Sequence, residues 1–158
     1  MCWVCEHPES SSEERLEYVR GLIVQNCWVV IGVHEELYRP PYSYTVGLTE
    51  QGRPELVITG LPQKRAADVL SSAAAEVLDG ATLTPGKHVR VAGGPMVEVV
   101  QLTEPGAHLD IAAALYERRL EAVQLVYADH RGYLPWDRRF RNGRGGQPVL
   151  GMRAEQAA

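Results

Sequence analysis

Apolar residues recur at helical spacing in three stretches of the chain, and each stretch predicts a helix. The first helix, residues 11–26, begins at a Ser-x-x-Glu capping box, in which a serine hydroxyl and a glutamate side chain satisfy two free backbone N–H groups. The second, residues 63–79, carries an apolar stripe and ends before Gly80, where a left-handed residue is expected. The third covers residues 107–120 and follows a Pro-Gly step that breaks the chain.

Short apolar runs, either continuous or alternating with polar residues, predict strands between the helices. The runs cover residues 27–33, 42–48, 55–59, 88–91, 96–102 and 122–128, with a short edge strand at 148–152. The run 27–33 is continuously apolar and is therefore expected to form a buried strand. Pro40 and Pro41 exclude a central strand before residue 42, because proline cannot donate to a ladder, and the turn 49–54 joins two strands into a hairpin.

The succession of these elements predicts an α+β fold, a single domain with a mixed, mostly antiparallel sheet and about three helices packed on it. A chain of 158 residues has the usual size of one domain, and it buries about 70% of its unfolded surface without needing a disulfide or a metal. We divide it into an N-terminal Cys-x-x-Cys segment, residues 1–10, the α+β domain, residues 11–152, and a frayed tail, residues 153–158. Residues 129–147 have no predicted regular structure.

Charge and cysteine content narrow the function mainly by exclusion. The net charge of −4 disfavours nucleic acid and acidic membranes as partners. No apolar run approaches the roughly 18 residues of a membrane span, and the acidic N-terminus does not resemble a signal peptide. Three cysteines, Cys2, Cys5 and Cys27, do not make the even set of a secreted disulfide framework. The sequence therefore predicts a reduced, cytoplasmic protein and leaves its oligomeric state open.

Cys2, Cys5 and His7 form the first candidate site. A Cys-x-x-Cys pair can bind one zinc ion tetrahedrally, and a nearby imidazole can add a third ligand. The fourth ligand would be Cys27, His34 or a water. The chain has no second Cys-x-x-Cys or histidine pair to complete the site, so a redox pair and a mobile N-terminus with two thiols are the alternatives.

The second candidate site lies on the hairpin of residues 39–61. Arg39 precedes its first strand, and Tyr44 and Thr45 lie on that strand. Because strand side chains alternate, Tyr42 and Tyr44 share one face, and an arginine beside an aromatic wall can hold an anion or a planar ligand. Cross-strand packing explains the same tyrosine and threonine residues without a ligand.

The third candidate site follows the predicted strand 122–128. Asp129 and His130 come directly after that strand, and Trp136 and Asp137 lie a few residues further on. Loops at strand ends commonly carry function, and these side chains can serve as acid, base, metal ligand or stacking surface. In the alternative interpretation Asp129 braces the loop through backbone hydrogen bonds, and Trp136 covers the core.

Arginines and aromatic residues alternate through the same loop, a pattern that resembles a surface for single-stranded nucleic acid. The arginines are Arg131, Arg138, Arg139, Arg141 and Arg144. The negative net charge of the chain favours a solvated loop instead. The glycines of residues 143–146 lack the Lys-Ser/Thr and the helix of a phosphate loop, and no hydrolase, zinc-protease or dinucleotide motif occurs elsewhere.

Several motifs, in order along the chain, resemble the bacterial family DUF4262, a domain of unknown function. They are Cys2-x-x-Cys5, Tyr44-Thr45-Val46-Gly47-Leu48, Pro54-Glu55-Leu56-Val57-Ile58-Thr59-Gly60-Leu61, Gln124-Leu125-Val126-Tyr127-x-Asp129-x-x-Gly132 and Pro135-Trp136-Asp137. The resemblance runs from about residue 2 to 150. It implies one cytoplasmic domain of a family that is frequent in actinobacteria and their phages, and it carries no activity or catalytic residue.

We therefore expect a small-ligand or metal-binding domain whose pocket lies between the 39–61 hairpin and the 129–137 loop. Its ligand-binding residues would come from both segments: Arg39, Tyr44, Thr45, Trp136 and Asp137. This expectation requires Tyr44 to lie near Asp129. Two further hypotheses stay open: a hydrolase or modifying enzyme of a biosynthetic pathway that uses Asp129 and His130 as catalytic groups, and a protein-interaction or regulatory module.

Overall fold

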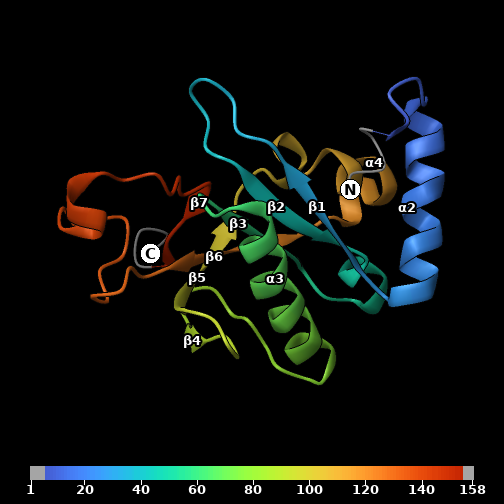
Figure 1. Ribbon diagram of the computed structural model, residues 1–158. Helices are drawn as coiled ribbons and strands as arrows, with labels where there is room; N and C mark the ends of the chain where they lie inside the picture. Colours follow the sequence, from blue (N-terminus) through green and yellow to red (C-terminus); the bar gives the residue numbers. More distant parts are fainter. Residues whose placement is uncertain (1–5, 155–158) are drawn as a thin grey trace.

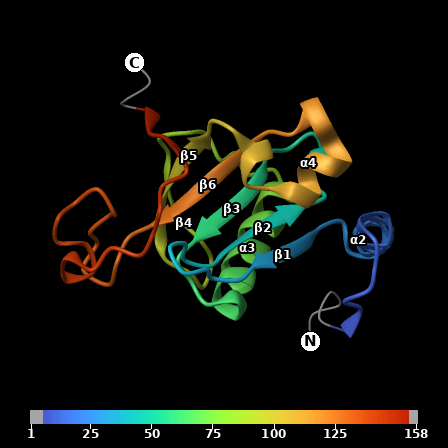
Figure 2. The ribbon, with the colours of Figure 1, turned by 90° about the horizontal axis from the view of Figure 1, so that it is seen from above.

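A single mixed sheet forms the centre of the molecule, with helices on both of its faces (Figures 1 and 2). The computed structural model describes residues 6–154. Helix α3 (Gln63–Leu78) covers one face, and α2 (Ser12–Asn26) and α4 (Asp110–Tyr116) pack on the other. The predicted α+β fold class is confirmed.

The sheet order is β1-β2-β3-β6-β5-β4, and β7 also pairs with β5. The strands are β1 (Val29–Val33), β2 (Tyr42–Val46), β3 (Glu55–Thr59), β4 (His88–Arg90), β5 (Met96–Leu102), β6 (Ala122–Tyr127) and β7 (Gly151–Met152). Strands β3 and β6 pair in parallel, whereas the other pairs are antiparallel. The carboxyl ends of β3 and β6 therefore lie at the same edge of the sheet.

Local signals place the first two helices correctly. Ser11 caps α2 by accepting a hydrogen bond from the Glu14 N–H at 3.1 Å, and the Glu14 carboxylate accepts one from the Ser11 N–H at 2.7 Å. The predicted third helix, 107–120, is shorter than expected: α4 is flanked by the 3₁₀ turns η2 (Pro105–Ala107) and η3 (Glu117–Arg119). It ends because Glu117 adopts a left-handed φ of 50°, which the α-helix cannot continue.

The predicted buried strand at 27–33 begins later and lies at an edge of the sheet. Strand β1 starts at Val29, and it pairs only with β2 among the described strands, so most of its residues are half-buried. Cys27, with a φ of 72°, closes α2 instead of entering the strand. A continuous apolar run indicates a strand but does not distinguish an edge position covered by a helix from a central one, and the prediction of a buried strand was wrong for this reason.

The two sheet faces have separate hydrophobic cores. Leu56, Ile58 and Leu125 face α3, while Tyr44 and Val57 face α2 and α4. Tyr42 and Tyr44 of β2 therefore share one face of the sheet, as predicted, although all five residues of this strand are buried.

Residues 129–150 leave the end of β6, project as a loop beside the sheet, and return along it (Figure 2). The side-chain amide of Gln147 holds the returning segment, since it accepts from the Tyr127 N–H and donates to the Tyr127 carbonyl, both at 2.9 Å. Gln124 donates to the Pro148 carbonyl at 2.8 Å and accepts from the Leu150 N–H at 2.7 Å. Apart from the short turn η4 (Phe140–Gly143), the loop lacks regular structure up to residue 147, as predicted.

In residues 6–154 no helix is both long and apolar enough to cross a membrane.

Candidate functional site

The carboxyl edge of the parallel strands β3 and β6 carries a concave surface built from three segments. One part of it is a pocket of about 440 Å³, which we call the hairpin pocket. It is lined by Glu35, Glu36, Leu37, Tyr38, Arg39, Pro40, Pro41, Gly60 and Gly146. Residues 35–41, which precede β2, and Gly146, in the returning loop, thus meet beside Gly60, directly after β3.

Residues 34–41, which link β1 to β2, are themselves folded as a small hairpin. The backbone groups of Glu36 and Arg39 exchange two hydrogen bonds, of 2.8 and 3.1 Å. Leu37 and Tyr38 form its tip and are 87% and 93% exposed. This tip stands at the rim of the hairpin pocket and presents apolar side chains to solvent.

Arg39 forms part of the pocket wall, as its position before the Pro-Pro step suggested. Its guanidinium donates to the His34 carbonyl at 3.2 Å, pairs with Glu36 at 3.2 Å and lies 5.2 Å from the centre of the Tyr42 ring. Its Nε is buried and has no hydrogen-bond partner in the described part of the chain. A buried donor without an acceptor is costly, so this arginine is incompletely satisfied by the protein itself.

A second pocket, of about 430 Å³, is lined by residues of the same returning loop. We call it the arginine pocket, and its lining residues are His130, Arg141, Asn142, Arg144 and Gly145. Gly145 lines this pocket and the next residue, Gly146, lines the hairpin pocket, so the 141–146 segment is a wall common to both.

The Arg141 side chain binds this common wall to the ends of β3 and β6 through hydrogen bonds. Its Nη2 donates to the Tyr127 hydroxyl at 2.8 Å and to the Gly60 carbonyl at 3.3 Å, and its Nη1 donates to the Gly145 carbonyl at 3.3 Å. Burial raises the pKa of the Tyr127 phenol, and the Arg141 guanidinium opposes that rise only in part, so the phenol stays neutral and accepts the bond.

The 141–146 wall lies so close to the end of β3 that the residue following this strand, Gly60, must be a glycine. A side chain at Gly60 would collide with the carbonyl of Gly146, and Gly60 has a left-handed φ of 76°. Both features exclude a β-carbon at this position without displacement of the loop.

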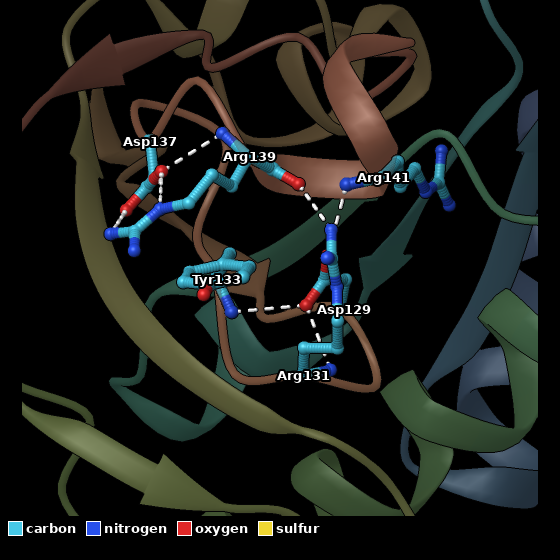
Figure 3. A network of polar contacts seen from close by, with 6 residues as sticks. All are labelled: Asp129, Arg131, Tyr133, Asp137, Arg139 and Arg141. Atoms are coloured by element: carbon cyan, nitrogen blue, oxygen red, sulfur yellow. Dashed lines mark hydrogen bonds and ion pairs between the residues drawn. The ribbon is translucent and has the colours of Figure 1, made fainter.

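Asp129 organises the loop from inside (Figure 3). Its Oδ1 accepts from the N–H groups of Arg131 at 2.9 Å and Tyr133 at 3.0 Å, and its Oδ2 accepts from the Arg141 N–H at 2.9 Å. Desolvation raises the pKa of Asp129, but these N–H donors outweigh it and hold the pKa below the ordinary aspartate value. The carboxylate lines neither pocket, which favours the interpretation that it braces the loop.

Asp137 binds within its own loop as well. Hydrogen bonds from Arg139 lower the pKa of Asp137 to about 2, and the two side chains meet at 2.8 and 3.0 Å. The Arg139 and Arg131 guanidinium groups lie 4.2 and 4.9 Å from the centre of the Tyr133 ring. These arginines therefore serve the loop, as Figure 3 shows.

Trp136 belongs to a third pocket, of about 300 Å³, beside β7. The Arg153 guanidinium lies 3.8 Å from the centre of the Trp136 ring and also binds the Glu98 carboxylate at 2.9 and 3.0 Å. His88 approaches the same carboxylate at 2.9 Å. Trp136 thus contacts Arg153, after β7, and does not line the hairpin pocket.

Tyr44 and Thr45 do not reach this surface. The Tyr44 hydroxyl accepts from the Ile111 N–H at 3.1 Å on α4, and Thr45 donates to the buried Glu55 at 2.7 Å. The structure therefore does not bring Tyr44 to Asp129. Of the predicted ligand-binding and catalytic residues, Arg39 and His130 line the two pockets.

The predicted metal ligands Cys2 and Cys5 lie outside the described residues, and His7 is exposed. Among residues 6–154, histidine, cysteine, aspartate and glutamate form no group of three that could hold a metal ion. Zinc binding at the N-terminus stays a prediction.

Sequence reasoning missed Arg141, Arg144 and Gly145 as site residues. In the sequence, the glycines near 143–146 resemble a phosphate loop that lacks its helix. Their relevant signal is different: glycines between arginines mark left-handed turns that expose backbone N–H groups next to positive charge.

Comparison with known proteins gives a family and no relative of known activity. Searches of curated proteins and of solved structures find no match. A family model described as a domain of unknown function, DUF4262, matches residues 22–141. The matched range includes β1 to β6 and reaches Arg141 in the common wall. Because the match extends over more than half of the chain, this protein belongs to the DUF4262 family.

Proposed function

We propose that this chain is a small-ligand-binding domain and that its ligand occupies the hairpin pocket and the arginine pocket. The observation that carries the proposal is the meeting of Arg39, Gly60 and Gly146 at the carboxyl ends of two parallel strands. Ligand sites of sheets with parallel strands are commonly located outside these ends. Both pockets have volumes within the usual range for small-molecule sites, about 300–1,000 Å³.

The polar groups at the two pockets favour binding over catalysis. A general base needs a reactive group within about 3 Å and a partner that orients it. Asp129 is occupied by backbone N–H groups, and His130 is exposed with no carboxylate paired to it in residues 6–154. Arg39, in contrast, lines the hairpin pocket and has one donor without an acceptor among the described residues.

A fragment titration followed by ¹H–¹⁵N NMR tests the proposal. We expect at least one neutral polar fragment to shift the Gly60 and Gly146 amide signals in a saturable way. The Arg39→Ala variant should weaken that binding about fivefold or more, because a charged hydrogen-bond donor is lost. Arg118→Ala is the matched control, since Arg118 is an exposed arginine on η3, at the amino end of β6. Absence of any saturable shift at either pocket, across a fragment library and inorganic phosphate, would refute the proposal.

The exposed tip of the small hairpin supports a second candidate, a protein-interaction module. Leu37 and Tyr38 are almost fully exposed, which is unusual for two adjacent large apolar residues. If they form an interface, a Leu37→Ser, Tyr38→Ser double variant will lose a partner captured by the wild-type chain and will keep its fragment binding. Equal capture by both proteins would exclude this candidate.

A further inference from the structure

We infer that the arginine pocket is a phosphate subsite, which binds either free inorganic phosphate or the phosphate group of an organic ligand. The inference rests on the proposed function, because the arginine pocket shares the 141–146 wall with the hairpin pocket. It adds the chemical class of the ligand, which the proposed function leaves unspecified.

The first argument is uncompensated positive charge. In the described part of the chain no ion pair joins Arg141 or Arg144 to a carboxylate. The Arg141 guanidinium instead donates to two carbonyl groups and a phenol, all of them neutral. A half-buried guanidinium whose partners are all neutral attracts an anion into the space beside it.

The charge of the whole loop points the same way. Residues 129–146 hold five arginines and two aspartates, a formal charge of three positive units, in a chain whose net charge is −4. Asp129 directs its oxygens to backbone N–H groups, and Asp137 binds Arg139. Neither carboxylate lines the arginine pocket, and both form their ion pairs with other arginines, Arg131 and Arg139.

The backbone supplies a second, independent set of donors. Arg144 has right-handed helical angles, with φ −79° and ψ −16°, and Gly145 follows with a left-handed φ of 63°. A right-then-left sequence is the backbone conformation in which successive N–H groups form an anion-binding concavity. The N–H groups of Gly145 and Gly146 have no acceptor within residues 6–154, and Gly145 lines the pocket.

Phosphate fits this donor set better than a carboxylate does. The pocket is lined by Arg141, Arg144, His130 and Gly145, which carry two guanidinium groups, an imidazole and a backbone N–H. A tetrahedral phosphate offers three terminal oxygens and close to two negative charges, whereas a carboxylate offers two coplanar oxygens and one charge. Donors carried by several separate residues are satisfied more completely by the tetrahedral group than by a planar one.

The test is an NMR titration of the full chain with inorganic phosphate, phenyl phosphate and acetate at constant ionic strength, with sodium chloride as the reference. We expect saturable shifts of the Gly145 and Gly146 amide signals with both phosphates and an affinity for acetate about tenfold lower. Arg144→Ala should weaken phosphate binding about fivefold or more, Arg144→Lys should restore part of it, and Arg118→Ala should leave it unchanged. Arg144 is exposed, so its replacement leaves the fold intact.

The two sources of phosphate give different results. Tighter binding of phenyl phosphate, with shifts that extend to Gly60, identifies an organic phosphate that spans both pockets, whereas equal affinities identify free phosphate. Three results would each overturn the inference. The amide shifts could follow the chloride concentration alone, Arg144→Ala could bind phosphate with the wild-type affinity, or acetate could bind with the same affinity as phosphate. Neutral fragments that bind at Gly60 without any phosphate effect would overturn this inference while leaving the proposed function in place.

Discussion

The Asp129 carboxylate accepts a hydrogen bond from the Arg141 N–H at 2.9 Å, while the Arg141 side chain extends away from Asp129 (Figure 3). That side chain continues to the Gly60 carbonyl, after β3. Arg141 has a left-handed φ of 49° and ψ of 36°, a conformation that costs a residue with a side chain about 1–2 kcal/mol. The bond to Asp129 offsets part of that cost and fixes the direction in which the guanidinium leaves the loop.

Asp129→Asn should loosen the loop without unfolding the domain. Asparagine keeps the size of aspartate, but its amide nitrogen cannot accept a hydrogen bond, so at least one of the three N–H groups loses its acceptor. We expect trypsin to cleave after the loop arginines about tenfold faster in this variant, because the local opening free energy falls. Cleavage at the wild-type rate would show that Asp129 does not brace the loop.

Asp137→Asn is the control for that experiment. Asp137 lies in the same loop, and its side chain accepts only from Arg139 in the described residues. An exposed ion pair contributes little, so the cleavage rate should change less than about twofold.

Glu55→Gln should destabilise the hairpin. The buried Glu55 carboxylate accepts four hydrogen bonds, from the Thr45 hydroxyl, the Gly47 N–H, and the N–H and hydroxyl of Thr49. Oε1 accepts three of these bonds and Oε2 accepts the one from Thr45. A glutamine nitrogen at Oε1 leaves the Gly47 and Thr49 N–H groups unpaired, and a nitrogen at Oε2 loses the bond from Thr45. Either orientation should lower the free energy of unfolding, by about 1–3 kcal/mol in urea titrations. An unchanged midpoint would show that burial of the charge costs as much as the bonds contribute.

The pH dependence of the same pair of proteins gives a second measurement. Burial raises the pKa of Glu55 above its ordinary value, against the opposing effect of its hydrogen bonds. A raised carboxyl pKa means that the folded state holds its proton at a higher pH than the unfolded state, so stability falls as the pH rises through that window. The stability of the wild type relative to Glu55→Gln should therefore increase on acidification toward pH ~4.5.

The sequence predicts correctly the features that depend on neighbouring residues, and it predicts less well the features that depend on residues far apart in the chain. Strands β3 and β5 have the predicted bounds because alternation and flanking turns are local signals. The edge position of β1 depends on what pairs beside it, and the early end of α4 depends on the backbone at Glu117. Neither feature is encoded in a short window of sequence.

The candidate site was only partly predictable for the same reason. Arg39 and His130 can be recognised from the sequence because they stand at a Pro-Pro step and at a strand end, and both signals are local. Arg141 stands in a run of arginines that predicts a solvated loop, and its contact with Gly60 cannot be predicted locally because the two residues are 81 positions apart in the sequence. Tyr44 has the composition of a ligand wall, but its hydroxyl is taken by α4, which no periodicity could reveal.

Glu98→Gln should weaken the contacts of β5 with β4 and with the residues after β7. Glu98 binds Arg153 through two hydrogen bonds and His88 through one, and its side chain is 5% exposed. Loss of the charged acceptor should lower the free energy of unfolding by about 1–2 kcal/mol at pH 7. A double-mutant cycle with Arg153→Ala isolates the pair, and purely additive effects would exclude coupling between the two residues.

The Glu98 pair should also give a characteristic acid dependence. Desolvation raises the pKa of Glu98, but Arg153 and His88 outweigh it, and the net pKa lies below the ordinary value. Such a carboxylate stabilises the fold above the unfolded pKa of about 4.3, and the stabilisation is lost as the pH falls through the folded pKa. The difference between wild type and Glu98→Gln should therefore shrink below about pH 4. A difference that grows on acidification would contradict this assignment.

Gly60→Ala should separate the returning loop from β3, and Gly52→Ala provides a closely matched control. Both glycines have left-handed φ values, 76° and 70°, so both variants pay the backbone cost of about 1 kcal/mol for a β-carbon in that region. At Gly52 the added carbon meets nothing within 4 Å, whereas at Gly60 it collides with the Gly146 carbonyl and comes within 3.1 Å of the Tyr127 hydroxyl. We expect Gly60→Ala to lose about 2 kcal/mol more than Gly52→Ala in the free energy of unfolding measured in urea, because the loop or the strand end must move.

Ligand binding gives a second measurement on the same two variants. Displacement of the loop would break the hydrogen bond from Arg141 to the Gly60 carbonyl, so Gly60→Ala should lose ligand binding at both pockets while Gly52→Ala keeps it. Equal stability and equal binding in the two variants would show that the contact between Gly60 and Gly146 does not shape the two pockets.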